Sequence, residues 1–158
     1  MNVSYTIVSD TVTPDLKARL ARVQNPEPAL RRMGEVLVEW AQNAFTVPSQ
    51  RPAVWPELSP RTLAKKKKEK HGSEPLIASG TLARSPRVVS VTRNEVVVGS
   101  DRETKKGSGI SLAAIHQLGA PRRHIPARPF FPFQNGHTMP EAQAQVAAIL
   151  RSWLNSGR

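Results

Sequence analysis

ISLAAIHQLGAPRRHIPARPFFPF, residues 110–133, is the stretch on which the interpretation of the whole chain depends. Ser111 can cap a helix whose apolar side chains continue to Leu118, and Gly119 is typical of the residue that follows a helix end. Prolines then recur between Ile125 and Phe133, which argues against a central strand and favours an edge strand or an extended arm. This composition is typical of an assembly element and contains no catalytic apparatus.

The arm carries three phenylalanines that one small sheet cannot easily bury, and exposed apolar patches mark interfaces. We therefore predict a subunit interface formed by Ile125, Arg128, Phe130, Phe131 and Phe133. The alternative is that all three rings belong to the core. His116 is expected to pack where its helix meets the sheet, so His116 and Gly119 together form the predicted fold junction.

Other segments predict an α+β domain. Alternating apolar residues predict a strand near residues 2–9, and Thr13-Pro14-Asp15 predicts the start of a short helix that ends near Val23. A long amphipathic helix follows over residues 27–45, and valines around an Asn94 turn predict a hairpin over 89–98. A second long helix begins after Thr138 with capping-box spacing. We expect an antiparallel sheet of about three to four strands with both long helices on one face.

Residues 46–75 interrupt these patterns with repeated prolines and a run of lysines. Ser59 and Pro60 can start a short helix on which Lys65, Lys66, Lys67 and Lys68 would be solvated. Connections of this length are usually functional or disordered. We therefore expect one domain over 1–158, with 46–75 as a mobile basic insertion.

The charge of the chain is uneven, because most of the net +11 lies in residues 51–123. Contact with nucleic acid or with an acidic protein surface is one interpretation, and a solvated face is the other. The chain contains no cysteine, no apolar run long enough to span a membrane and no visible signal peptide. A protein that folds in the cytoplasm without contacting a membrane is therefore expected.

The sequence contains no recognisable catalytic or metal-binding motif. The four histidines, His71, His116, His124 and His137, lack the close spacing of a zinc site. The segment around Lys105 lacks the glycine and the hydroxyl residue of a phosphate-binding loop. We therefore expect neither an enzyme nor a cofactor.

Five motifs in a fixed order give the chain a family resemblance. They are Trp55 to Thr62 with the following lysine run, Leu76 to Leu82, the hairpin end Val98-Gly99-Ser100, the helix 114–119, and Ile125 to Phe130. In this order they resemble the phage virion morphogenesis family, which includes Mu-like and tail-completion proteins. The resemblance covers residues 28–133. The chain departs from the family pattern at Leu112 and at Phe131-Pro132-Phe133.

The resemblance implies a non-enzymatic structural protein of the virion neck or tail, assembled in the host cytoplasm. It implies a ring, with a hexamer expected, that completes the tail and joins it to the head. Expected partners are further copies of the chain, the connector or head-completion protein, and tail tube or tail terminator proteins. In such a ring Lys65–Lys68 would form a basic collar that faces DNA or an acidic rim. The alternative is a small basic nucleic-acid-binding protein.

Overall fold

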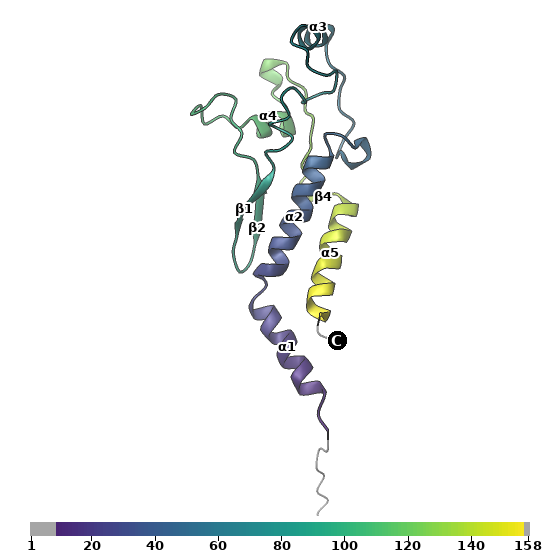
Figure 1. Ribbon diagram of the computed structural model, residues 1–158, viewed down its shortest axis with the longest axis vertical. Helices are drawn as coiled ribbons and strands as arrows, with labels where there is room; N and C mark the ends of the chain where they lie inside the picture. The colour runs from purple at the N-terminus through teal and green to yellow at the C-terminus, as the bar shows by residue number, and fades with distance from the viewer. Residues whose placement is uncertain (1–8, 157–158) are drawn as a thin grey trace, which may run out of the picture.

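The computed structural model describes residues 9–156 as an elongated molecule with helix α1 projecting from one end (Figure 1). The helices are α1 (Val12–Gln24), α2 (Glu27–Asn43), α3 (Pro60–Lys68), α4 (Leu112–Leu118) and α5 (Pro140–Asn155), with short 3₁₀ turns η1 (Pro48–Gln50) and η2 (Pro121–Arg123). The strands are β1 (Arg87–Val91), β2 (Val96–Gly99), β3 (Phe133–Gln134) and β4 (His137–Thr138). The α+β composition expected from the sequence is confirmed.

Helix α2 is the element against which the others pack. Helix α5 lies along one side of it, where the Trp40 indole Nε1 donates a hydrogen bond of 2.8 Å to Oε1 of Gln145. The β1–β2 hairpin lies against another side, at Gly34. A Cβ at this position would lie 2.6 Å from Cγ2 of Val96, so glycine is needed for the close approach of helix and hairpin.

The hairpin forms as its valine pattern predicts. Its strands pair antiparallel with Val91 opposite Val96, and the N–H of Thr92 bonds to the carbonyl of Glu95 across a turn centred on residues 93–94. The register shifts between Val88 and Ser90. This bulge interrupts the pairing on one strand, and bulges of this kind bend and twist a sheet.

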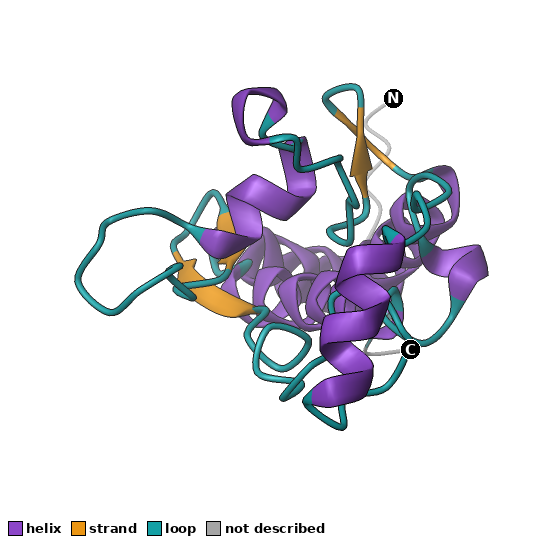
Figure 2. Cartoon of the chain, turned by 90° about the horizontal axis from the view of Figure 1, so that it is seen from above, coloured by secondary structure: helices purple, strands orange, loops and turns teal. Residues whose placement is uncertain are grey.

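The sheet is smaller than expected. The described residues form two separate two-stranded antiparallel sheets, β1–β2 and β3–β4, which lie in different places around the helices (Figure 2). The arm does not join the hairpin because its prolines remove ladder donors. The predicted strand at 2–9 lies almost wholly outside the described residues. Helix α5 packs on α2 and α1, so the two long helices do not share one face of a sheet.

The core lies beyond the end of α2, where three aromatic rings from distant segments meet. Phe45 packs edge-on against Trp55 with ring centroids 5.7 Å apart, and its centroid lies 5.0 Å from that of Phe130. Leu82 and Ala113 complete this cluster of buried residues. Phe130 is 0% exposed, so one ring of the predicted interface belongs to the core instead.

The segment 46–75 is anchored on this core through its first half. Trp55 is buried, its Nε1 donates a hydrogen bond of 2.7 Å to the carbonyl of Pro129, and the Arg51 guanidinium lies 4.1 Å above its ring. Helix α3 forms in the second half, with the Ser59 hydroxyl accepting from the Thr62 N–H as its N-cap. The segment is thus tied to the arm at Pro129, 74 residues away in sequence.

We expect Phe130→Ala to lower the free energy of unfolding by about 3–5 kcal/mol, because truncating a fully buried phenylalanine leaves a cavity. Phe133→Ala is the matched control, since Phe133 is 37% exposed and its truncation leaves no closed cavity. Urea denaturation followed by circular dichroism measures both values. Equal losses in the two variants would contradict the placement of Phe130 in the core.

Candidate assembly interface

The arm from Ile125 to Phe133 divides its predicted interface residues between inside and outside. Phe130 and Arg128 are buried within the protomer, Ile125 and Phe131 are half-buried, and Phe133 reaches the surface. Only the last three of these have side-chain surface left for a neighbouring subunit. The interface prediction therefore narrows to Ile125, Phe131 and Phe133.

Gln117 of helix α4 makes the backbone hydrogen bonds to the arm that a neighbouring strand would make in a sheet. Its Oε1 accepts hydrogen bonds of 3.0 Å from the N–H groups of Phe130 and Phe131, and its Nε2 donates to the Phe131 carbonyl at 3.3 Å. The Arg128 N–H donates to the carbonyl of His116. Side-chain amides can satisfy backbone groups that would otherwise be left unpaired by a missing ladder. The arm is extended yet fixed without a sheet.

The predicted fold junction lies where helix α4 ends against the arm. Gly119 adopts a φ of +78°, and a Cβ there would lie 2.9 Å from the backbone nitrogen of Ala127. His116 is half-buried, and its Nδ1 is buried without a hydrogen-bond partner among the described residues. Burial, reinforced by the positive charge of Arg128, lowers the pKa of His116, so its ring is neutral at pH 7. No group of three or more potential metal ligands occurs in residues 9–156.

An apolar groove lies beside the outer end of the arm. It has a volume of about 580 Å³, and the side chains of Leu118, Phe131 and Phe133 contribute to its walls. Leu118 is 78% exposed although it ends a helix that packs on the core. Apolar surface of this kind is typical of protein contacts.

The four lysines of the α3 run differ in how far they are exposed to solvent. Lys65, Lys67 and Lys68 are exposed, whereas Lys66 is half-buried and its Nζ donates to the carbonyls of Glu74 at 2.5 Å and Ile77 at 2.6 Å. Lys66 therefore fixes α3 onto the following loop. Three of the four residues in the predicted basic collar are available to a partner.

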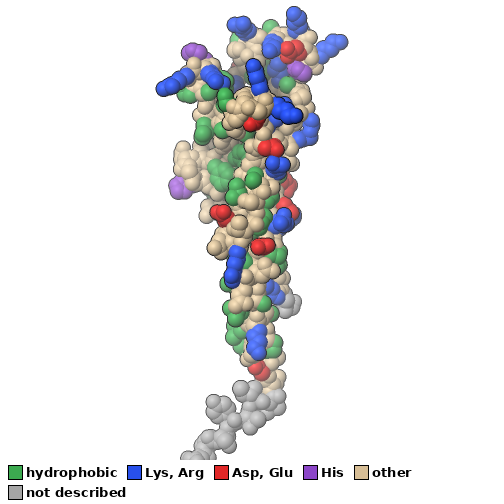
Figure 3. All heavy atoms as spheres, turned by 90° about the vertical axis from the view of Figure 1, so that its left-hand side faces the viewer, with side chains coloured by type: hydrophobic (Ala, Val, Ile, Leu, Met, Phe, Trp, Pro, Cys, Tyr) green, Lys and Arg blue, Asp and Glu red, His purple; other side chains and the backbone are tan. Residues whose placement is uncertain are grey.

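The most exposed apolar surface lies on α1, which the sequence interpretation treated only as a short helix. Its Val12, Leu16, Leu20 and Val23 are between 56% and 64% exposed. Their spacing places all four on one stripe of the helix. Figure 3 shows hydrophobic side chains at the surface of this narrow end. The spacing of these four residues in the sequence is the signal that identifies the stripe. Among the described residues, no helix is long and apolar enough to cross a membrane.

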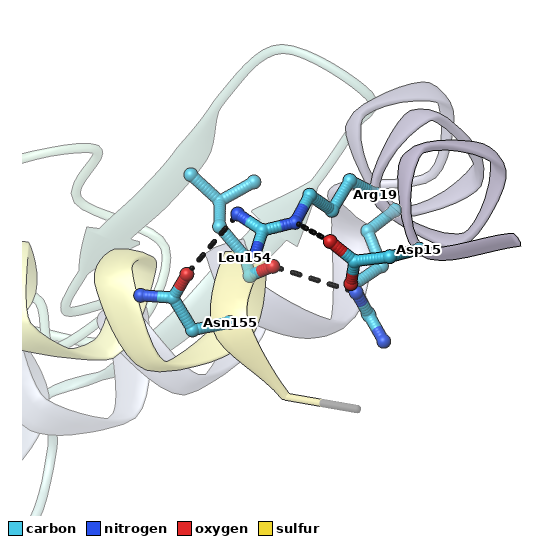
Figure 4. Close-up of polar contacts among 5 residues, drawn as sticks. Asp15, Arg19, Leu154 and Asn155 are labelled. Carbon is cyan, nitrogen blue, oxygen red and sulfur yellow. Dashed lines mark hydrogen bonds and ion pairs between the residues drawn. The ribbon is translucent and has the colours of Figure 1, made fainter. Parts of the chain in front are cut away.

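The polar face of α1 is the one turned toward the rest of the protomer. Arg19 pairs with Asp15 at 2.9 Å and donates to Oδ1 of Asn155 at 3.3 Å, while Arg22 donates to the Leu154 carbonyl (Figure 4). These three α1 side chains are half-buried, and the apolar stripe is not. The helix starts at Val12, ahead of the cap predicted at Thr13, and Oδ1 of Asp10 accepts hydrogen bonds from the N–H groups of residues 12 and 13. In the isolated protomer, α1 therefore turns its polar face inward and exposes its apolar face to solvent.

Comparison with known proteins identifies the family of the chain. No curated protein and no solved structure matches the chain significantly. A sequence profile of the phage virion morphogenesis family matches residues 8–155, which is nearly the whole chain and extends the resemblance on both sides of residues 28–133. The match includes α1 and α5 as well as the motifs of the arm and hairpin. The chain belongs to the phage virion morphogenesis family.

Proposed function

We propose that this chain is a structural subunit of a ring at the neck or tail of the virion, where it completes the tail and joins it to the head. The expected ring is a hexamer. Its further partners would be the connector or head-completion protein on one side and tail tube or tail terminator proteins on the other. Membership of the virion morphogenesis family supports the structural role, and the ring is our inference from the surfaces of the protomer.

The observation that carries the proposal is the exposed stripe of α1. A helix of 13 residues is marginal in water unless an apolar face packs against something. Residues 9–156 cover only a polar face of α1, and a second molecule could cover the apolar one. Burial of apolar surface stabilises such a contact by roughly 25 cal/mol per Å².

A second copy of the chain is the partner that best fits the stripe. The groove beside Leu118 and Phe133 is apolar. Helix α4, which ends at Leu118, lies far from α1 in the ribbon diagram (Figure 1). A contact between two different surfaces of identical chains is heterologous, and such contacts close into rings when the rotation permits. The groove is therefore the site we propose for the neighbour's α1.

The opposite end of the molecule supplies the charged surface of the proposed ring. Lys and Arg side chains gather at the end formed by α3 and the loops around it (Figure 3). The exposed lysines are Lys65, Lys67 and Lys68, and η2 adds exposed Arg122 and Arg123. Repeated around a ring, this end would make a basic collar toward DNA or an acidic protein rim.

We expect the double substitution Leu16→Asp with Leu20→Asp to convert the assembled protein into a folded monomer, because charges on the stripe cannot be buried at an apolar contact. Size-exclusion chromatography with light scattering measures the mass, and circular dichroism checks the helix content. Ala18→Asp is the matched control, because it places a carboxylate on α1 outside the stripe. Equal dissociation by the control, or a monomeric parent protein, would contradict the proposal.

We expect the triple substitution of Lys65, Lys67 and Lys68 by glutamine to reduce head–tail joining while leaving the mass of the assembly unchanged. Lys66 is kept because it holds α3 in place. Joining is measured by mixing purified heads with tails assembled with the variant. A variant with glutamine at Arg93, Lys105 and Lys106 removes the same charge from exposed loops elsewhere. Full joining activity in the first variant would refute the collar.

The charge favours a second candidate function, that of a small basic nucleic-acid-binding protein. The net charge of +11 is the observation behind it. The two functions differ in their dependence on salt, because phosphate contacts release counterions and weaken steeply as salt rises. Apolar subunit contacts persist at high salt.

We expect the assembly to keep its mass at 1 M salt, where the Debye length is about 3 Å instead of about 10 Å at 0.1 M. Light scattering across a salt series, with filter binding of duplex DNA in parallel, measures both properties. A monomer that binds DNA tightly at low salt would favour the second function.

A further inference from the structure

A cavity of about 450 Å³ lies between α3, the loop at residues 76–78 and the start of the arm. Lys66, His116 and Arg128 contribute polar walls, and Leu76, Ile77 and Ile125 contribute apolar ones. Neither the α1 stripe nor the groove beside Phe133 takes part in it. The cavity therefore has its own chemistry.

Arg128 brings a buried positive charge to this cavity without a carboxylate to balance it. The residue is 6% exposed, and no ion pair joins it to any acidic group in residues 9–156. Its Nε and Nη2 donate to the carbonyl of Pro56 at 3.0 and 2.8 Å, and Nη2 also donates to that of Glu57 at 3.0 Å. The remaining nitrogen, Nη1, donates to no described residue. Nη1 is not completely buried, so its N–H groups are available to an acceptor that enters the cavity, and buried charges are usually paired.

Lys66 brings a second positive charge to the same cavity. Its ammonium group has three N–H donors, and two of them are used by the carbonyls of Glu74 and Ile77. Among the described residues no carboxylate forms an ion pair with Nζ, although the Glu74 carboxylate is close enough to act on its charge. Glu57 also borders the cavity, but its side chain is exposed and makes no ion pair with either cation. Two cations thus share one cavity with donors to spare.

We propose that this cavity binds an aspartate or glutamate side chain of a partner protein that docks on the α3 end of the molecule. Arginine and lysine donors match a carboxylate, and a charge-assisted hydrogen bond is about twice as strong as a neutral one. The walls formed by Leu76, Ile77 and Ile125 suit apolar residues beside the acidic one. A cavity of about 450 Å³ has the size of a few side chains, so it cannot enclose a nucleic-acid duplex.

The proposal rests on the proposed function only for the nature of the partner, a protein of the virion assembly. Binding at the cavity can be measured on the isolated chain whether or not it forms a ring. A failure at the cavity therefore leaves the ring proposal standing, and the reverse also holds.

The test uses protein with ¹³C-labelled isoleucine methyl groups and the peptide acetyl-Leu-Asp-Leu-amide. We expect the methyl signals of Ile77 and Ile125 to shift and saturate as peptide is added. Ile149 lines a different surface hollow beside α5 and should not move. The control peptide acetyl-Leu-Asn-Leu-amide has the same shape without the charge. Equal shifts with both peptides, or none with the first, would overturn the proposal.

Substitutions separate the cavity from general charge attraction. Lys66→Gln should weaken binding of the aspartate peptide about tenfold, the effect of one hydrogen bond to a charged group. Lys68→Gln removes the same charge from an exposed position of α3 and should leave the affinity unchanged. Equal weakening by both variants would overturn the proposal.

A third variant covers the case in which Lys66→Gln loosens α3. Ala78→Trp narrows the cavity at an exposed wall residue without touching either cation, and it should abolish the shifts while thermal unfolding stays normal. Retained binding in this variant would overturn the proposal. Inorganic phosphate supplies the last arm, because tighter binding of phosphate than of the peptide would assign the cavity to phosphate groups instead.

Discussion

The clamp between residues 51–57 and the arm is the contact on which the rest of the structure depends. Residues 51–57 and 126–132 form no strand ladder, and their prolines remove donors that a ladder needs. Their backbone groups are satisfied by side chains instead: Trp55 donates to Pro129, Arg128 to Pro56 and Glu57, and Gln117 bonds both N–H and C=O groups of the arm. Phe130 and Phe45 then close the core between them. Because unpaired buried backbone groups are costly, loss of this clamp would release the arm, α3 and the groove together.

The same clamp explains why the two ends of the molecule differ. At the α3 end, apolar rings and part-buried side-chain hydrogen bonds hold residues 51–57, the arm and α4 together. At the α1 end, the polar contacts with α5 are hydrogen bonds from two partly exposed arginines. The Asp15–Arg19 ion pair lies within α1 and contributes about 0.3–0.5 kcal/mol to the helix itself. The apolar stripe beside these contacts makes none of them. The family match over residues 8–155 includes this helix.

Helices and the hairpin could be predicted from the sequence because their patterns repeat. The apolar stripe of α2 follows the period of a helix, and the valines around Asn94 follow the period of a strand, so each pattern indicates one secondary structure. The arm could not be resolved in this way, because Phe130, Phe131 and Phe133 are separated by prolines and follow no period. Which ring is buried depends on Trp55 and Phe45, which no local pattern connects to the arm. The single sheet was wrong for a related reason: an extended proline-rich segment looks like an edge strand, but its partners here are a glutamine and a histidine carbonyl. The absence of an ion pair at Arg128 among the described residues could not be predicted, because the sequence does not reveal which groups surround its guanidinium.

The break between α1 and α2 at Asn25 and Pro26 has a consequence for how copies of the chain could fit together. Proline disfavours helical geometry at the preceding residue, so the two helices meet at a joint and not along one rigid rod. The contacts that set the angle of this joint are few and solvent-facing, so changing it costs little free energy. A chain built this way can take up differences in spacing between neighbours without disturbing its core. In the proposed ring this joint lies next to the α1 stripe, so it would let neighbouring copies differ in spacing without a change in their cores.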